Sequence, residues 1–117
     1  MNIAIVGSRN FTNYNYMKNS FLKKLENYLY NTEITIVSGG APGADTLAEK
    51  IAEEFNLGKP VVFPAEWKKF GKGAGLIRNT KIVENTDMML AFPLAESKGT
   101  WDAIRKGKNK GIPVHIF

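Results

Sequence analysis

The chain has 117 residues, of which 44% are hydrophobic and 23% charged, as in one ordinary soluble globular domain. Its net charge of +5 favours an anionic partner such as a nucleotide, a nucleic acid or an acidic protein, although lysines spread along the chain also fit a plain solvated surface. It has no cysteine, no apolar run of membrane-spanning length and no signal-peptide pattern, which excludes a disulfide framework and leads us to expect one cytoplasmic domain over residues 1–117.

Short apolar strands alternate with helical patterns along the chain. In chain order we expect a strand at 2–6, a helix at 17–30, a strand at 34–37, a helix at 44–55, a strand at 60–64, a helix at 76–85, a strand at 87–92, a helix at 99–110 and a strand at 112–117. A glycine-rich loop is expected at 68–75. Gly58 should cap the second helix, and Gly107 should weaken the last one.

The predicted strands are apolar throughout, without the alternation of a half-exposed strand. This pattern is typical of a parallel sheet covered by helices on both faces, and right-handed crossovers leave few topologies for it. We therefore expect an α/β fold with an open, doubly wound, five-stranded parallel sheet of order 3-2-1-4-5. Ligands bind such sheets beyond the carboxyl ends of the strands, where the winding reverses, here between the first and fourth strands.

Three loops rich in small residues reach this edge, namely GSRNF (7–11), SGGAPGAD (38–45) and PLAESKGT (93–100). Glycines after a strand let a ligand approach the backbone, and the next helix offers free N–H groups that suit phosphate. The residues of these loops that we expect to contact a ligand are Gly7, Ser8, Arg9, Ser38, Gly39, Gly40, Gly43, Asp45, Lys98, Gly99 and Thr100. Each loop also fits a plain turn followed by a helix cap.

Two further candidates lie on the predicted helix at 76–85. Arg78 is flanked by apolar residues and is followed by Asn79. An arginine in this setting either snorkels to the surface or points into the site, and the pattern alone favours the surface.

The segment before that helix could close over a ligand. Trp67 can stack on a base or cover the edge of the core. Gly71, Gly73 and Gly75 would let the segment move as a lid. The single histidine, His115, is interpreted as structural, and no cluster of side chains has metal-ligand spacing, so we expect no metal and no cofactor.

Six stretches distributed along the chain together carry a family resemblance, namely GSRNFTNY, VSGGAPGADTLAEKIAEEF, FPAEWKKFGKGAGLIRNTKIV, TDMMLAF, SKGTWDAI and GIPVHIF. Through them nearly the whole chain resembles the YspA-like branch of the SLOG superfamily. This superfamily has a Rossmann-like three-layer sandwich, and it includes the DprA/Smf DNA-processing proteins and the Lonely-guy phosphoribohydrolases. The resemblance implies a bacterial or phage protein that binds a nucleotide or a nucleotide-derived ligand at the loops described above.

The chain departs from the Lonely-guy enzymes, which split a nucleoside 5′-monophosphate at the base–sugar bond. Their signature is an arginine on a helix and then PGGxGTxxE, and here Arg78 and Gly99-Thr100 match its binding half. Ala103 stands where the signature has its glutamate. Asp102 is one residue early, about 100° away around a helix, and is not expected to substitute.

Three functions follow from these observations. The main hypothesis is a module that binds a nucleotide or nucleotide-derived small molecule. We expect no association with a membrane, and the sequence allows a homo-oligomer. The alternative is a nucleotide hydrolase that cleaves an N-glycosidic bond, with Arg78, Asp45 and Glu66 as candidate catalytic residues. A second alternative is a DNA- or RNA-binding protein related to DprA, ranked last because the lysines form no clear stripe interleaved with aromatic residues.

Overall fold

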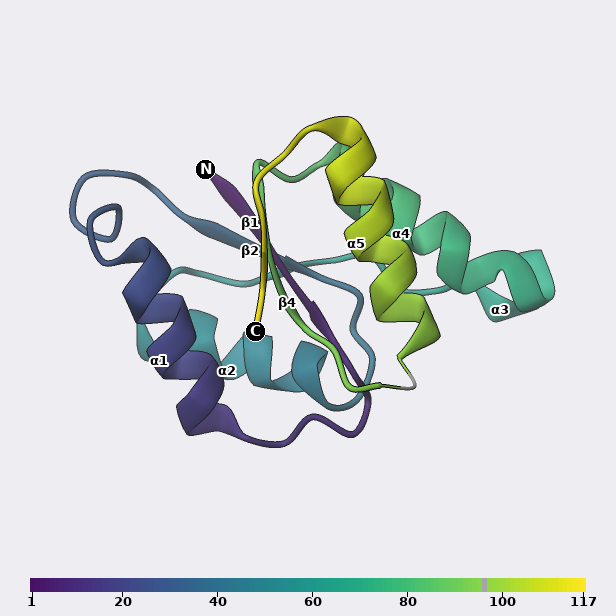
Figure 1. Ribbon diagram of the computed structural model, residues 1–117, viewed down its shortest axis with the longest axis horizontal. Coiled ribbons are helices and arrows are strands. Elements are labelled where there is room, and N and C mark those ends of the chain that lie inside the picture. The colour runs from purple at the N-terminus through teal and green to yellow at the C-terminus, as the bar shows by residue number, and fades with distance from the viewer. Residues whose placement is uncertain (96) are drawn as a thin grey trace.

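The computed structural model describes residues 1–95 and 97–117. Strands and helices alternate along these residues, as the sequence predicts (Figure 1). The elements are β1 (Asn2–Gly7), α1 (Tyr14–Leu25), β2 (Thr35–Ser38), α2 (Ala44–Glu54), β3 (Val61–Val62), α3 (Trp67–Phe70), the 3-10 turn η1 (Gly71–Gly73), α4 (Ala74–Glu84), β4 (Met88–Phe92), α5 (Lys98–Lys110) and β5 (Val114–Ile116). None of the helices in the described ranges has the length and apolar character needed to cross a membrane.

The strands form one parallel sheet in the order β3-β2-β1-β4-β5, which confirms the predicted topology. β1 is the central strand, and its register with β4 runs from Ile3↔Met88 to Gly7↔Phe92. The helices α1 and α2 cover one face of the sheet, and α4 and α5 cover the other (Figure 1). The winding therefore reverses between β1 and β4, and the loops that follow them leave the sheet side by side.

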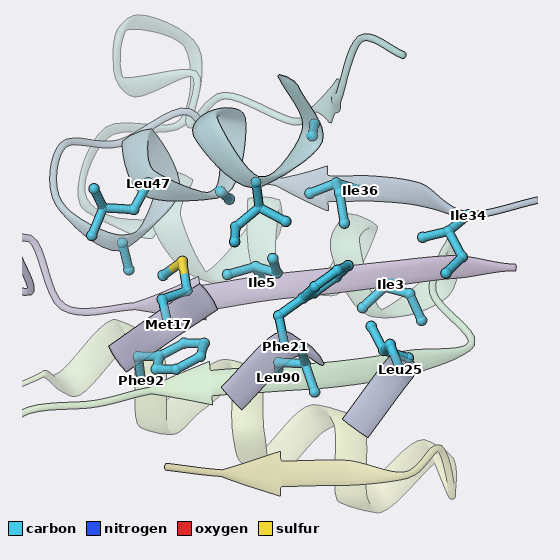
Figure 2. Packing of buried hydrophobic residues seen from close by; sticks show 14 residues of the cluster. Ile3, Ile5, Met17, Phe21, Leu25, Ile34, Ile36, Leu47, Leu90 and Phe92 are labelled. Atoms are coloured by element: carbon cyan, nitrogen blue, oxygen red, sulfur yellow. The ribbon is translucent and has the colours of Figure 1, made fainter. Parts of the chain in front are cut away.

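Two apolar clusters hold the layers together. The larger one packs Phe21 of α1 and Leu47 of α2 onto Ile5 and Leu90 of the sheet (Figure 2). The smaller one packs Ile82 of α4 and the apolar side of α5 onto the opposite face. Phe21 is fully buried, and burial of a side chain of this size contributes about 2 kcal/mol or more to folding.

The first two helices end before the residues that the sequence predicts. α1 ends at Leu25 rather than at residue 30, and turns follow it. α2 ends at Glu54, and both Asn56, with φ +54°, and Gly58, with φ +77°, take positive-φ conformations after it. The Leu57 N–H then donates to the Ala52 carbonyl at 2.8 Å, which closes the helix in the manner of a Schellman motif.

The segments around the third strand also differ from the sequence-based expectation. β3 is only two residues long, because the flanking prolines have no N–H to donate to a ladder. The prediction of a loop at 68–75 is wrong, because the chain forms α3 and η1 there and then continues directly into α4. α3 lies at the end of the molecule away from the sheet (Figure 1).

Gly107 does not interrupt α5, which runs unbroken for 13 residues. A Cβ at this position would lie 3.0 Å from Val114 Cγ2 and 3.4 Å from Met89 Cε. Glycine therefore lets α5 approach the sheet closely, and the tighter packing offsets its low helix propensity.

Candidate functional site

A cavity of about 690 Å³ opens at the carboxyl ends of β1 and β4, at the point where the winding reverses. Among the predicted site residues, those on its wall are Gly7, Ser8, Arg9, Gly39, Asp45, Trp67, Arg78, Asn79, Lys98, Gly99 and Thr100. Ser38, Gly40, Gly43 and Glu66 do not line it. Of the charged residues on the wall, sequence reasoning missed Lys72, although a lysine among glycines just before a helix is a recognisable phosphate-binding signal.

Arg78 points into the site, contrary to what its apolar neighbours suggested. Its Nη1 donates to the Gly39 carbonyl at 3.1 Å, and its Nε donates to Asn79 Oδ1 at 3.0 Å. A Cβ at residue 39 would clash with the guanidinium. The absence of a side chain at Gly39 therefore leaves room for the Arg78 guanidinium in its observed position.

Asn79 continues this network to the opposite wall. It is 4% exposed, and its Nδ2 donates to the Gly99 carbonyl at 2.9 Å and to Asp102 Oδ2 at 3.1 Å. The loop after β2, α4 and the start of α5 are thus joined through two adjacent side chains. This connection holds the walls of the cavity together, because a buried and well-bonded amide tolerates little displacement.

Asp102 binds side chains of α4 and α5 and does not contribute to the cavity wall. Burial opposes its ionisation, but hydrogen bonds from Lys106 and Asn79 and the positive charges of Lys106 and Arg105 hold its pKa below the ordinary value. Lys106 Nζ lies 2.9 Å from Oδ2. Asp102 does not line the cavity, which agrees with the helical offset seen in the sequence.

The first turn of α5 faces the cavity with free backbone N–H groups. No side chain of the described residues caps it, because Ser97 Oγ instead accepts from the Leu94 N–H at 3.0 Å. Nothing lies within 4 Å of a Cβ placed on Gly99. The alternative of a plain Ser97 or Thr100 cap is therefore wrong, and the turn leaves its amides and its positive dipole end available to an anion.

The glycines after β2 have packing roles in this structure. A Cβ on Gly40 would lie 2.7 Å from Val62 Cγ1, and one on Gly43 would lie 2.5 Å from the Ser8 carbonyl oxygen. The Ala41 N–H donates to Asp45 Oδ2 at 3.0 Å, so one amide of the expected phosphate cradle is already occupied. Phosphate binding by Gly40 and Gly43 stays a prediction.

Asp45 is 6% exposed and lies at the first turn of α2. Burial raises its pKa from 3.8 to about 6, against the opposing effects of hydrogen bonds from the Ala41 and Gly39 amides and of the Arg78 charge. It is the only acidic side chain on the cavity wall within residues 1–95 and 97–117. The site thus holds one carboxyl group that titrates near neutral pH, as groups in functional sites often do.

We expect Asp45→Asn to stabilise the fold at pH 7 by on the order of 2 kcal/mol, because the folded state resists ionisation of this group. Its folded-state pKa lies above the unfolded value, so the wild-type free energy of unfolding should fall as pH rises from about 4 to about 6. Urea unfolding at several pH values would measure the difference. Near pH 4 the free energy of unfolding of Asp45→Asn should differ little from that of the wild type. The control Glu53→Gln changes an exposed residue on the same helix, and its difference from the wild type should not grow in this way as pH rises.

The cavity is strongly cationic. Four cationic side chains line it, each from a different segment: Arg9 after β1, Lys72 in η1, Arg78 on α4 and Lys98 at the start of α5. Trp67 is 52% exposed and also lines the wall. Convergent cations and an exposed indole suit a ligand that carries both phosphate and an aromatic base.

Residues 1–92 match the profile of the DNA recombination-mediator protein A family. The chain belongs to this family. It is 36% identical over 121 residues to the gene 61 protein of Mycobacterium phage D29, and the match covers 98% of this chain and 94% of the phage protein. The predicted relation to the DNA-processing proteins is confirmed, whereas the YspA-like branch in particular stays a prediction.

Two solved structures share the fold. DNA processing protein A from Helicobacter pylori, described with a single-stranded DNA binding mode, matches with a TM-score of 0.71 at 20% identity. The protein of the same name from Streptococcus pneumoniae matches with a TM-score of 0.54 at 19% identity. The matches cover 99% and 97% of this chain but only 64% and 57% of those chains. At these identities the likeness shows the fold, which is the Rossmann-like sheet that the sequence predicts.

Proposed function

We propose that the protein binds single-stranded nucleic acid through the cavity at the carboxyl ends of the strands. The observation that carries this proposal is the convergence of Arg9, Lys72, Arg78 and Lys98 on one cavity beside the exposed ring of Trp67. Membership in a DNA recombination-mediator family supports it. It reverses the order of the sequence-based hypotheses, which placed nucleic acid last for want of a basic stripe.

The absence of a stripe in the sequence does not conflict with this proposal, because tertiary structure gathers the charges. Arg9 and Lys98 are 89 positions apart, yet both lie on the wall of one cavity. Such a cluster holds phosphates of a flexible strand, and the free amides of α5 add a further anion site. Unpaired bases can stack on an exposed indole without regard to their identity.

A single strand fits this geometry better than a duplex. The cations and the indole line a concave cavity rather than a flat or convex face. A duplex keeps its bases stacked inside and presents only its outer backbone, so it cannot place a base against Trp67. A single strand can turn a base and a phosphate into the cavity at low cost.

Fluorescence anisotropy with a labelled oligothymidine of about 15 nucleotides tests the proposal. If all four cations contact phosphates, log K should fall linearly with log salt concentration, with a slope of about −3 between about 50 and 200 mM. A duplex of the same length should bind more weakly. The absence of a signal at low salt, or affinity independent of salt, would contradict the proposal.

A mononucleotide ligand is the second candidate, because a cavity of about 690 Å³ is within the usual range for a small-molecule site. This candidate would be favoured if thymidine monophosphate displaced the labelled oligothymidine as effectively as an equal concentration of unlabelled oligothymidine. In the related hydrolase hypothesis, Glu66 lies off the cavity wall, which leaves Asp45 as the carboxylate and Arg78 as the phosphate-side cation. Release of free base from nucleoside monophosphates, followed by chromatography, would test that hypothesis.

A further inference from the structure

Asp45 is unusual among the residues of the cavity. The wall carries four cations, and Asp45 is its only acid within the described parts of the chain. No ion pair of 4.0 Å or less joins its carboxylate to a described lysine or arginine. Arg78, the nearby cation, uses Nη1 on the Gly39 carbonyl and Nε on Asn79. The carboxyl therefore lines a cationic cavity without forming an ion pair with a described lysine or arginine.

The surroundings of Asp45 do not demand the ionised form. The Ala41 N–H donates to its Oδ2 at 3.0 Å, and the Gly39 amide also favours the carboxylate. A protonated carboxyl keeps an oxygen that can accept such a bond. Glu49, one turn further along α2, adds a like charge that disfavours ionisation, and Arg78 across the loop favours it. Arg9, Lys72 and Lys98 face the same cavity from three further segments.

An entering phosphate changes this balance. A phosphodiester placed among the four cations offsets part of their positive charge and brings a negative charge into the cavity that Asp45 lines. Because Asp45 is buried, water screens this repulsion poorly, and the carboxyl is favoured to take up a proton. The diester cannot do so near neutral pH, and the carboxyl can.

Resting on the proposed nucleic-acid function, we propose that the protonation state of Asp45 controls binding of the strand: in its neutral form it admits an anionic strand, and in its ionised form it opposes one. Binding of a strand is then accompanied by uptake of one proton at Asp45. Burial already raises the pKa of this carboxyl to about 6, so changes of pH around this value would change the affinity.

Oligothymidine without terminal phosphates tests this inference, because neither its bases nor its diester linkages titrate between about pH 5 and pH 8. At constant low salt, wild-type affinity should be about tenfold weaker at the alkaline end, if binding raises the pKa of the carboxyl by roughly one unit. Asp45→Asn should lose this dependence and bind throughout as the wild type does at the acid end. His115→Gln should keep the wild-type profile, since that residue lies on β5 and does not line the cavity.

Titration calorimetry in two buffers of different ionisation enthalpy supplies a second readout, because it counts the protons that are taken up. The wild type should take up a substantial fraction of one proton near neutral pH, and Asp45→Asn should take up none. Equal pH profiles for the two proteins, or wild-type affinity that rises with pH, would overturn this inference and leave the proposed function standing. The absence of binding at every pH would overturn both.

Discussion

Replacing Gly43 with alanine should destabilise the fold by about 3 kcal/mol or more, the largest loss that we expect from a single methyl group in this protein. Gly43 precedes α2 with φ +80° and ψ −124°, a conformation that residues with a side chain rarely adopt. The added Cβ would also lie 2.5 Å from the Ser8 carbonyl oxygen and would clash with the Arg9 carbonyl. Both obstacles are backbone atoms, which cannot rotate away.

Gly58→Ala is the matched control for this substitution. Gly58 has a similar φ of +77°, but nothing lies within 4 Å of its Cβ position. Its alanine variant should therefore show backbone strain alone, about 1 kcal/mol. Urea unfolding monitored by tryptophan fluorescence would compare the two. If the two variants lost the same free energy of unfolding, the close contact between the loops after β1 and β2 would contribute nothing to the effect of Gly43→Ala.

The second large effect concerns nucleic-acid binding. The triple variant Arg9→Ala, Lys72→Ala, Lys98→Ala should bind oligothymidine about a hundredfold more weakly in 0.1 M salt, because each lost phosphate contact removes about 0.7 from the salt slope. Arg78 is left in place, since its hydrogen bonds to Gly39 and Asn79 hold the cavity together. The slope of log K against log salt should therefore fall by about 2.

A triple variant with the same number of removed charges separates the site from the overall charge. Lys23, Lys24 and Lys59 are exposed and do not line the cavity. Changing these three to alanine should reduce the affinity only slightly, through the long-range field of the protein. If both triple variants lose affinity equally, binding follows net charge, and the cavity has no particular role.

The topology of the sheet and the location of the cavity could be predicted from the sequence. Apolar strands separated by amphipathic helices imply a parallel sheet, and handed crossovers then allow few orders. Because the carboxyl ends of parallel strands share one edge, the loops that begin at Gly7, Gly39 and Pro93 had to meet there. Local pattern and chain connectivity suffice for such inferences.

The orientation and packing of individual residues could not be predicted in this way, because they depend on contacts between segments that are distant in the sequence. The apolar neighbours of Arg78 favour the surface, but the Gly39 carbonyl, 39 positions away, draws its guanidinium into the site. Helix propensity marks Gly107 as a weak point, but contact with Val114 makes glycine the residue that fits. No local signal reports either partner, because each belongs to another element of the fold.

Asp45 shows most clearly the difference between what the sequence predicts and what the tertiary structure decides. The sequence by itself determined that a carboxylate lies at the start of a helix beside the cavity, and it left open whether that carboxylate caps the helix, binds a ligand or takes part in catalysis. Only the tertiary structure decided that the group is buried, lines the cavity and has a pKa raised to about 6. The physical reason is that desolvation depends on everything packed around a group, whereas sequence shows only its neighbours along the chain.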